Sequence, residues 1–281
     1  TVQWSGYVPY WSPVQSRFSA FNPTTTTVRP IRGEDVPVLG RIQTGTLRPS
    51  ERVSFHKPFP GYPPPVNPNT PEVEGLIVDI DGTLVDSNYL HVLAWQRALS
   101  QHDIDADGWK IHHYIGKGGD KMVTSVAGEA AEQAHGDEIR DVESELFQQL
   151  IDEVRPFDGA DRFIEEVKEA GLTVVLSSSA KEEEVERYFD LIGIRDMIDA
   201  FTCSADVDAT KPEPDLIEIG LEKAGTRNCL MIGDSIWDVE AAKRSGIDCL
   251  GVLTGGFSKA ELLAAGASQV QPSLADLEIP A

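Results

Sequence analysis

Two aspartates, Asp79 and Asp81, lie where an apolar run of β-branched residues, 75–80, approaches Gly82. Such a run predicts a buried strand that ends in a turn at the glycine. Side chains alternate along a strand, so both carboxylates are expected on one side of its C-terminal end. Because adjacent carboxylates repel, the pair needs compensation, which a hard cation such as Mg²⁺ provides together with phosphate and water. The alternative is a solvated strand end that carries two acids by chance.

Three further polar clusters follow apolar runs later in the chain. Ser177 ends the run 172–177, Lys211 precedes Pro212, and Asp234 and Asp238 lie four residues apart after Gly233. Taken singly, a strand-ending serine is usually a helix cap, a Lys-Pro pair a loop, and a Gly-Asp pair a turn. Their common position at the ends of apolar runs favours one shared site.

Apolar strands alternate with amphipathic helices through the second part of the chain. Strands are predicted at 172–177, 200–204, 229–234, 248–253 and 269–270, and helices at 87–99, 122–134, 137–151, 157–170, 181–191, 212–224 and 238–245. Ser87 is placed to cap the first of these helices. This order predicts an α/β protein with a Rossmann-like parallel sheet covered by helices on both faces. Ligands of such sheets bind at the carboxyl ends of the strands, where all four clusters fall.

The four clusters resemble the sequence motifs of the haloacid dehalogenase (HAD) superfamily. Asp79-Ile80-Asp81-Gly82-Thr83 resembles its first motif, Ser177 its second and Lys211 its third. The fourth motif is matched by Gly233-Asp234-Ser235-Ile236-Trp237-Asp238, and the resemblance covers about residues 73–281.

The resemblance implies a role for each of these residues. Asp79 would be the nucleophile that takes a phosphoryl group, and Asp81 the acid that protonates the leaving oxygen and then activates water. Ser177 and Lys211 would hold the phosphoryl oxygens. Mg²⁺ would be bound by Asp79, the backbone carbonyl of Asp81 and Asp234, with Asp238 ligating or orienting nearby. The adjoining residues Gly82, Thr83 and Ser178 are expected to contact the substrate.

The 98 positions between Asp79 and Ser177 exceed what one crossover needs, and residues 89–158 are predicted to be helical. This resembles the branch with a helical cap that includes phosphoglycolate phosphatases and β-phosphoglucomutases. We therefore expect a core formed by 73–88 and 159–281, with a cap at 89–158. A glycine-rich loop in this cap carries Lys117 and Lys121, which either close over an anionic substrate or belong to an ordinary exposed turn.

The charge of the chain is unevenly distributed. The net charge is −22; residues 1–70 carry seven Lys and Arg against three acids, and residues 71–281 carry seventeen against forty-three. So acidic a body argues against nucleic-acid binding. No apolar run reaches membrane-spanning length, no signal-peptide pattern opens the chain, and the three cysteines suit buried free thiols, so we expect a cytoplasmic protein that does not bind membranes.

Residues 1–72 differ from the rest in composition, since thirteen of the eighteen prolines lie at or before Pro71. We expect an extension and linker, with a β-hairpin at about 36–58 that resembles one in the barrel domain of translation elongation factors. The GxxxxGK[ST] phosphate-binding motif is absent, so that likeness implies no GTPase activity. The extension packs on the body, recruits a protein partner or is a fusion remnant.

Together these patterns predict a Mg²⁺-dependent phosphatase that hydrolyses a small phosphorylated metabolite through an aspartyl-phosphate. A phosphoglucomutase-type phosphotransferase with the same residues is the first alternative. A partner-binding protein recruited through residues 1–72 is the second.

Overall fold

The computed structural model describes residues 72–278, and the predicted hairpin at about 36–58 lies outside them. A six-stranded parallel sheet forms the centre, in the order β5-β4-β1-β6-β7-β8. Its strands are β1 (Gly75–Val78), β4 (Thr173–Ser177), β5 (Ala200–Thr202), β6 (Cys229–Gly233), β7 (Asp248–Val252) and β8 (Gln269–Gln271). The chain runs outward from β1 in both directions, so the strand order reverses beside β1, where ligands of such sheets bind.

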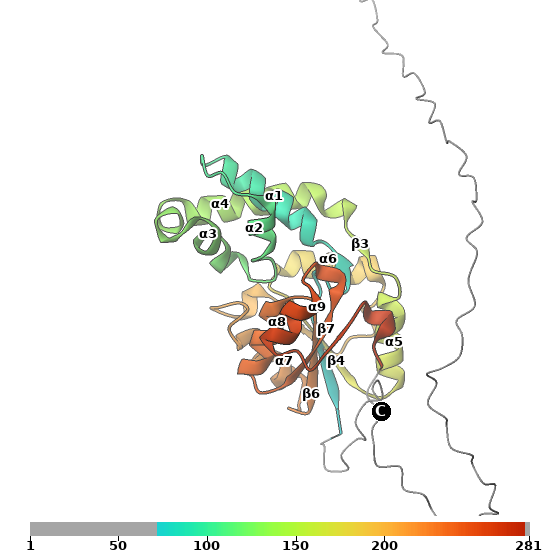
Figure 1. Ribbon diagram of the computed structural model, residues 1–281. Coiled ribbons are helices and arrows are strands. Elements are labelled where there is room, and N and C mark those ends of the chain that lie inside the picture. The colour runs from blue at the N-terminus through green and yellow to red at the C-terminus, as the bar shows by residue number, and fades with distance from the viewer. Residues whose placement is uncertain (1–71, 279–281) are drawn as a thin grey trace, which may run out of the picture. The chain divides into compact units, whose positions relative to one another are not determined.

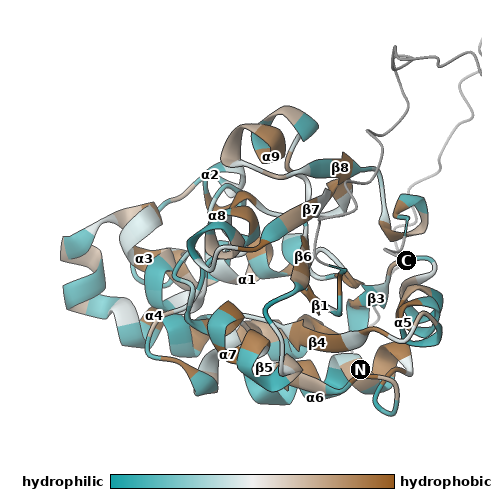
Figure 2. Cartoon of the chain, turned by 90° about the horizontal axis from the view of Figure 1, so that it is seen from below, coloured by the Kyte–Doolittle hydropathy of each residue, from teal (hydrophilic) through white to brown (hydrophobic). Residues whose placement is uncertain are grey.

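Side chains of β1 alternate between the two faces of the sheet. Leu76 and Val78 pack into one apolar cluster, with α5 (Ala160–Glu169) and α6 (Glu182–Ile192). Ile77 packs into the other, with α7 (Asp215–Ala224), α8 (Ile236–Arg244) and α9 (Lys259–Ala265). Figure 2 shows the apolar strands enclosed by these helices. The fully buried β1 explains why its sequence is continuously apolar.

Four helices form a separate group above the carboxyl ends of the strands (Figure 1). They are α1 (Asn88–Ser100), α2 (Gly108–His112), α3 (Gly119–Ala127) and α4 (Glu129–Leu150). Their own apolar cluster includes Trp95, Ile111, Met122 and Ile139. A two-stranded antiparallel ribbon, β2 (Val85–Asp86) with β3 (Arg155–Pro156), joins the group to the core. We call α1–α4 the cap.

The fold class is the one that the sequence predicts, whereas several element boundaries differ. The break between the third and fourth cap helices lies at Gly128, with φ of 90°, and α4 then continues through 134–137. Helix α7 begins only at Asp215, after two prolines of the preceding loop. Ser87 is the N-cap residue of α1, as its position predicts, but its hydroxyl makes no capping hydrogen bond and donates to Asp81 instead. Short α2 and α9 were not predicted.

Two other sequence-level expectations concern the body of the chain. No helix among residues 72–278 has the length and apolar character needed to cross a membrane. Cys203, Cys229 and Cys249 are all buried and free of disulfides.

Candidate active site

Three neighbouring strands bring the site residues to one edge of the sheet. β1 lies between β4 and β6, with Val78 opposite Leu176 on one side and Ile232 on the other. Asp79 follows β1 directly, and its backbone N–H donates to the carbonyl of Ile232 at 2.9 Å. Ser177 is the last residue of β4 and Asp234 the first after β6. Parallel pairing therefore places these three positions side by side.

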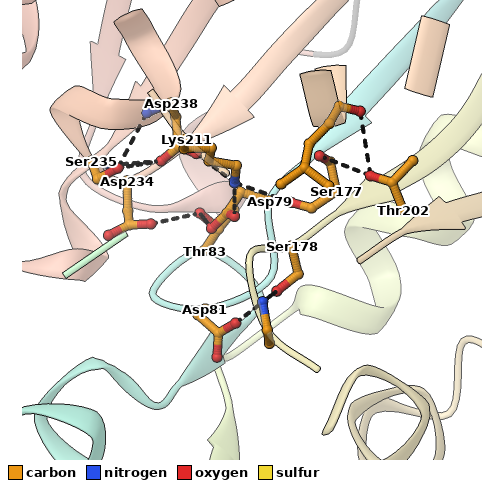
Figure 3. A network of polar contacts seen from close by, with 12 residues as sticks. Asp79, Asp81, Thr83, Ser177, Ser178, Thr202, Lys211, Asp234, Ser235 and Asp238 are labelled. Atoms are coloured by element: carbon orange, nitrogen blue, oxygen red, sulfur yellow. Dashed lines mark hydrogen bonds and ion pairs between the residues drawn. The ribbon is translucent and has the colours of Figure 1, made fainter. Parts of the chain in front are cut away.

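The Lys211 ammonium lies at the centre of this group and is buried, with 1% of the residue exposed. It forms ion pairs with Asp79 and, at 2.8 Å, with Asp238, and it donates to the Ser177 carbonyl at 3.1 Å (Figure 3). Burial lowers the pKa of Lys211, but the facing carboxylates of Asp238 and Asp79 outweigh burial and raise the pKa above its usual value. The ammonium thus stays charged.

Asp79, Asp234 and Asp238 form a buried carboxylate cluster, each with one oxygen within 4.8 Å of the others. Three carboxylates face a single ammonium, so the cluster carries an excess of two negative charges when all are ionised. Burial and the neighbouring acids raise the pKa of Asp234 well above its usual value. Burial likewise raises the pKa of Asp79 to about 7, against the opposing effect of Lys211. Oxygen donors with this charge excess fit a hard divalent cation.

Within the cluster, the Asp238 carboxylate makes more polar contacts with neighbouring residues than the carboxylates of Asp79 and Asp234 do. One of its oxygens pairs with Lys211, and the other accepts from the backbone N–H and hydroxyl of Ser235 at 3.1 and 2.6 Å. Asp238 is therefore placed to orient Lys211 as well as to contribute charge to a cation.

The Asp81 side chain points away from that cluster (Figure 3). It accepts from the hydroxyls of Ser87 at 2.6 Å and Ser178 at 3.0 Å, and the His91 Nε2 lies 3.7 Å away. Burial raises the pKa of Asp81, but these neighbours outweigh burial and lower it below its usual value. Because the side chain of Asp81 is engaged elsewhere, only its backbone carbonyl is available to bind a cation at the cluster.

His91 links Asp81 to the cap. Its Nδ1 lies 3.1 Å from an oxygen of Glu143 on α4, and its ring stacks on Phe147 with centroids 3.6 Å apart. Burial lowers the pKa of His91, but Asp81 and Glu143 outweigh it and raise the pKa to about 10. At neutral pH the proton of the Asp81–His91 pair therefore resides on the imidazole.

The turn after β1 is closely packed against Asp234. Gly82 has φ of 81°, and a Cβ atom there would lie 2.5 Å from an Asp234 oxygen, so only glycine fits. The amide of Asn88, the first residue of α1, donates to the same carboxylate at 3.0 Å. Thr83 Oγ1 lies 3.2 Å from Asp79 and 3.1 Å from Asp234, and its single proton serves one of them at a time. Gly82 and Thr83 thus shape the cluster itself.

Ser177 and Ser178 face different surroundings. Both serines are fully buried, but the Ser177 hydroxyl accepts from Thr202 on the neighbouring strand at 3.1 Å, and it is the Ser177 carbonyl that accepts from Lys211. The Ser178 hydroxyl instead donates to Asp81. Of the two, Ser178 is the one that presents a hydroxyl toward the reacting groups.

A cavity of about 270 Å³ opens between the cap and the sheet edge. Asp79 and Asp81 line its floor, and the cap contributes Trp95, Lys117 and Glu143 to its walls. The Lys117 ammonium lies over the ring of core residue Trp237, 4.1 Å from its centroid. Lys117 itself lines the cavity.

Lys121 has a different environment from Lys117. It donates to the backbone carbonyl of Thr210 at 2.7 Å and lies 3.6 Å from Glu213. The preceding Asp120 accepts from the Thr210 backbone N–H at 3.4 Å and from its hydroxyl. These contacts attach the first turn of α3 to Thr210, the residue next to Lys211.

Sequence reasoning missed Asn88, His91 and Glu143. Asn88 and His91 lie in the predicted helix at 87–99, where polar side chains are usually on the exposed surface of the helix. Glu143 lies in a helix with many acids, and nothing in the sequence distinguishes it from the exposed ones. The spacing of Asn88 and His91, three apart near the start of α1, was the one available signal that both face the core.

Comparison with known proteins gives the relationships of this chain. Residues 76–252 match the family model described as haloacid dehalogenase-like hydrolase. A haloacid dehalogenase-like hydrolase domain-containing protein of Arabidopsis thaliana is 25% identical over 92% of each chain. The phosphoglycolate phosphatase of Yersinia pestis is 28% identical over 68% of this chain and 85% of its own.

Solved structures agree with this relationship. A hydrolase from Pseudomonas syringae is 30% identical, covering 72% of this chain and 95% of its own, with a TM-score of 0.69. A β-phosphoglucomutase from Clostridium difficile shares the fold at 21% identity and a TM-score of 0.65, covering 73% of this chain and 93% of its own.

Proposed function

The chain belongs to the haloacid dehalogenase-like hydrolases and is a phosphoric monoester hydrolase, and from that premise we propose that it is a Mg²⁺-dependent phosphatase acting on a small phosphorylated metabolite through an aspartyl-phosphate. The observation that carries this proposal is the pairing of the buried Lys211 ammonium with Asp79 inside a cluster of three carboxylates. An ammonium and a cation beside one carboxylate are what an incoming phosphate dianion requires.

Asp79 is the group we assign as nucleophile. Its carboxylate attacks phosphorus, and the bond to the leaving oxygen breaks as the bond to Asp79 forms, giving an acyl phosphate. Lys211 offsets the charge repulsion between carboxylate and phosphate and stays close to both. We assign the Ser178 hydroxyl, rather than that of Ser177, to binding a phosphoryl oxygen, because Ser177 faces Thr202.

Asp81 is assigned to proton transfer. The Asp81–His91 pair holds one proton at neutral pH, so a proton for the leaving oxygen is stored beside Asp81. Once the leaving group has gone, Asp81 accepts a proton from water, which attacks the phosphorus of the acyl phosphate and releases Asp79.

The residues that would hold Mg²⁺ are Asp79, Asp234 and the backbone carbonyl of Asp81, with Asp238 beside them. The ion would neutralise negative charge on the phosphoryl oxygens and on the nucleophile. The charge excess of the cluster is the feature of this structure that fits the ion.

The substrate is expected to be small, with a phosphoryl group at the carboxylate cluster and its remainder beneath the cap. A cavity of about 270 Å³ suits a metabolite such as a phosphoglycolate or a sugar phosphate. The phosphoglycolate phosphatase relatives support the first of these classes.

A phosphotransferase of the β-phosphoglucomutase type is the second candidate. The cap residue His91 lies beside Asp81 and is held by Glu143 on α4, so the cap contacts the proposed proton-transfer group. A cap that excludes water is what such an enzyme needs while its intermediate waits for a sugar phosphate.

Turnover of p-nitrophenyl phosphate with and without Mg²⁺ tests the proposal. Steady phosphate release that EDTA abolishes and Mg²⁺ restores supports the phosphatase. A stable aspartyl-phosphate without steady release favours the phosphotransferase. Equal release in EDTA would contradict the metal requirement. A panel of phosphorylated metabolites then identifies the substrate.

A further inference from the structure

Two histidines and a glutamate converge on the outer part of the cap, apart from the residues that line the active-site cavity. His102 follows α1, while His135 and Glu138 lie three residues apart on α4. The two histidine Nδ1 atoms lie 3.8 and 3.5 Å from the same Glu138 oxygen, Oε2. One ligand atom from each residue lies within 4.8 Å of the others.

We propose that His102, His135 and Glu138 form a second metal site, which takes a transition-metal ion of the Zn²⁺ class and joins the end of α1 to α4. Zn²⁺ is bound at about 2.0–2.2 Å by histidine nitrogens and carboxylate oxygens, so ligands at tetrahedral corners are roughly 3.4 Å apart. The separations of Glu138 Oε2 from the Nδ1 atoms of His135 and His102, 3.5 and 3.8 Å, are already close to that spacing.

The donor set separates this site from the active-site cluster. Imidazole nitrogens suit Zn²⁺, Ni²⁺, Cu²⁺ and Co²⁺, whereas a site built of carboxylate oxygens suits Mg²⁺. Two imidazoles with one carboxylate therefore favour ions such as Zn²⁺, whereas the cluster of Asp79, Asp234 and Asp238 favours Mg²⁺. With three protein ligands, the fourth tetrahedral position is left for water.

The arrangement of the two rings and the local charge both favour a cation. The rings of His102 and His135 lie 5.0 Å apart, tilted by 38°, with Nδ1 of each directed at Glu138. Helix α4 carries seven Asp and Glu against one Arg, so its surface attracts cations. His102 is mostly buried at its side chain, with 16% exposed, which limits the conformations it must lose on binding.

Calorimetric titration of the full chain with Zn²⁺, in the presence of excess Mg²⁺, tests this site. We expect one Zn²⁺ per chain under these conditions, and a rise in Tm on addition of Zn²⁺ because the ion binds only when both helices are in place. Replacing Zn²⁺ by Co²⁺ should give the visible absorption of a tetrahedral complex.

Substitutions then assign the ligands. H102A, H135A and E138Q should each weaken Zn²⁺ binding at least about tenfold and abolish the Zn²⁺-dependent rise in Tm. D141N is the matched control, because Asp141 is an exposed acid three residues farther along α4, and it should leave Zn²⁺ binding unchanged. Hydrolysis of p-nitrophenyl phosphate with Mg²⁺ should be unaltered in all four variants, so this test is independent of the proposed reaction.

Three results would overturn the proposal. Zn²⁺ binding that persists unchanged in H102A and H135A would place the ion elsewhere in the chain. Equal weakening by D141N would reduce the effect to surface charge. Absence of binding by the native chain at Zn²⁺ concentrations up to 1 mM, roughly the weakest affinity of a specific site, would remove the site altogether.

Discussion

Asp79 and Asp81 are two residues apart, yet their surroundings push their pKa values in opposite directions. Burial raises that of Asp79, whereas His91, Ser87 and Ser178 overcome burial and lower that of Asp81. Pairs of acids in contrasting environments mark separate chemical roles. In this site Asp79 belongs to the carboxylate cluster that is proposed to hold a cation, whereas Asp81 shares a proton with His91.

Replacing Asp79 by Asn should abolish turnover and leave the fold intact. The amide keeps the shape and a contact with Lys211 but cannot attack phosphorus, so kcat should fall by more than about a thousandfold. Steady-state assays with Mg²⁺ measure the loss, and circular dichroism with a thermal melt provides the control for folding. Substantial residual activity in D79N would refute its assignment as nucleophile.

Ser178 and Ser177 provide a matched pair of substitutions. S178A removes the hydroxyl that contacts Asp81 and, by our assignment, the phosphoryl group, so kcat/KM should fall roughly tenfold to a hundredfold. S177A removes a hydroxyl directed at Thr202 and keeps the carbonyl that binds Lys211, so kcat/KM should change less than about threefold. The opposite order of effects would return the role to Ser177.

Glu184 on α6 should make the protein less stable as the pH rises. Burial raises the pKa of this group from 4.5 to about 7, so the folded protein holds its proton more tightly than the unfolded chain. The stabilisation is complete below pH 4.5 and is lost as the pH rises through 7. E184Q, which cannot ionise, should therefore be more stable than the native protein at pH 8, by up to about 3 kcal/mol.

Urea unfolding at pH 8 and at pH 5 measures this difference, which should shrink at the lower pH. E183Q is the control, because Glu183 is an exposed neighbour on the same helix and should show no such pH-dependent gain. A native protein as stable as E184Q at pH 8 would contradict the prediction.

At the level of elements, the strands could be predicted well and the cap helices less well. Each central strand is a short apolar run because both faces of the sheet are covered, and that pattern is unambiguous. The cap helices instead lie on one another and on the core, so their polar and apolar residues alternate with less contrast. Gly128 ends α3, and its φ is positive. A glycine tolerates a positive φ but does not impose it, so the glycine alone does not mark the end of a helix.

The same contrast applies to the site. Asp79, Asp81 and Asp234 follow the ends of β1 and β6, so the sheet topology brings them to one edge. Lys211 lies in the loop before α7 and Asp238 in the first turn of α8, so their positions also depend on how those segments pack. Which of the two adjacent serine hydroxyls contacts Asp81 depends on the pleat and on Thr202, which is 25 residues from Ser177. His91 and Glu143 meet through the packing of α1 on α4, so their contact is a tertiary property that local sequence does not encode.

The attachment of the first turn of α3 to Thr210 should affect catalysis more than stability. D120N and K121M weaken the contacts with Thr210, whose neighbour is Lys211. A less firmly held loop around Lys211 should lower kcat/KM roughly tenfold when both changes are combined, with little change in Tm. Steady-state kinetics and a thermal melt measure the two effects, and K259M is the control, because Lys259 is an exposed residue at the start of α9. Unaltered kcat/KM in the double variant would show that this attachment does not support catalysis.

For the molecule as a whole, the acidic charge and the chemistry belong to the same part of the chain. Residues 71–281 carry a net charge of −26, and the site residues all lie between Asp79 and Asp238. A substrate with a negative phosphoryl group approaches this acidic body, so the local positive charges of Lys211 and a bound cation must outweigh the long-range repulsion. Raising the ionic strength screens that repulsion at distances beyond about 8–10 Å.

Removing residues 1–71 should leave turnover unchanged. The described residues 72–278 contain every residue to which we assign a role in the reaction. We therefore expect kcat and KM of the shortened chain to stay within about twofold of those of the full chain, measured side by side with Mg²⁺. Loss of a bound protein with unaltered turnover would identify the extension as a partner-binding segment, and loss of solubility would show that it packs on the body. A tenfold fall in kcat with an unchanged circular dichroism spectrum would contradict the assignment of the reaction to residues 72–278 alone, since some part of the extension would then have to reach the carboxylate cluster.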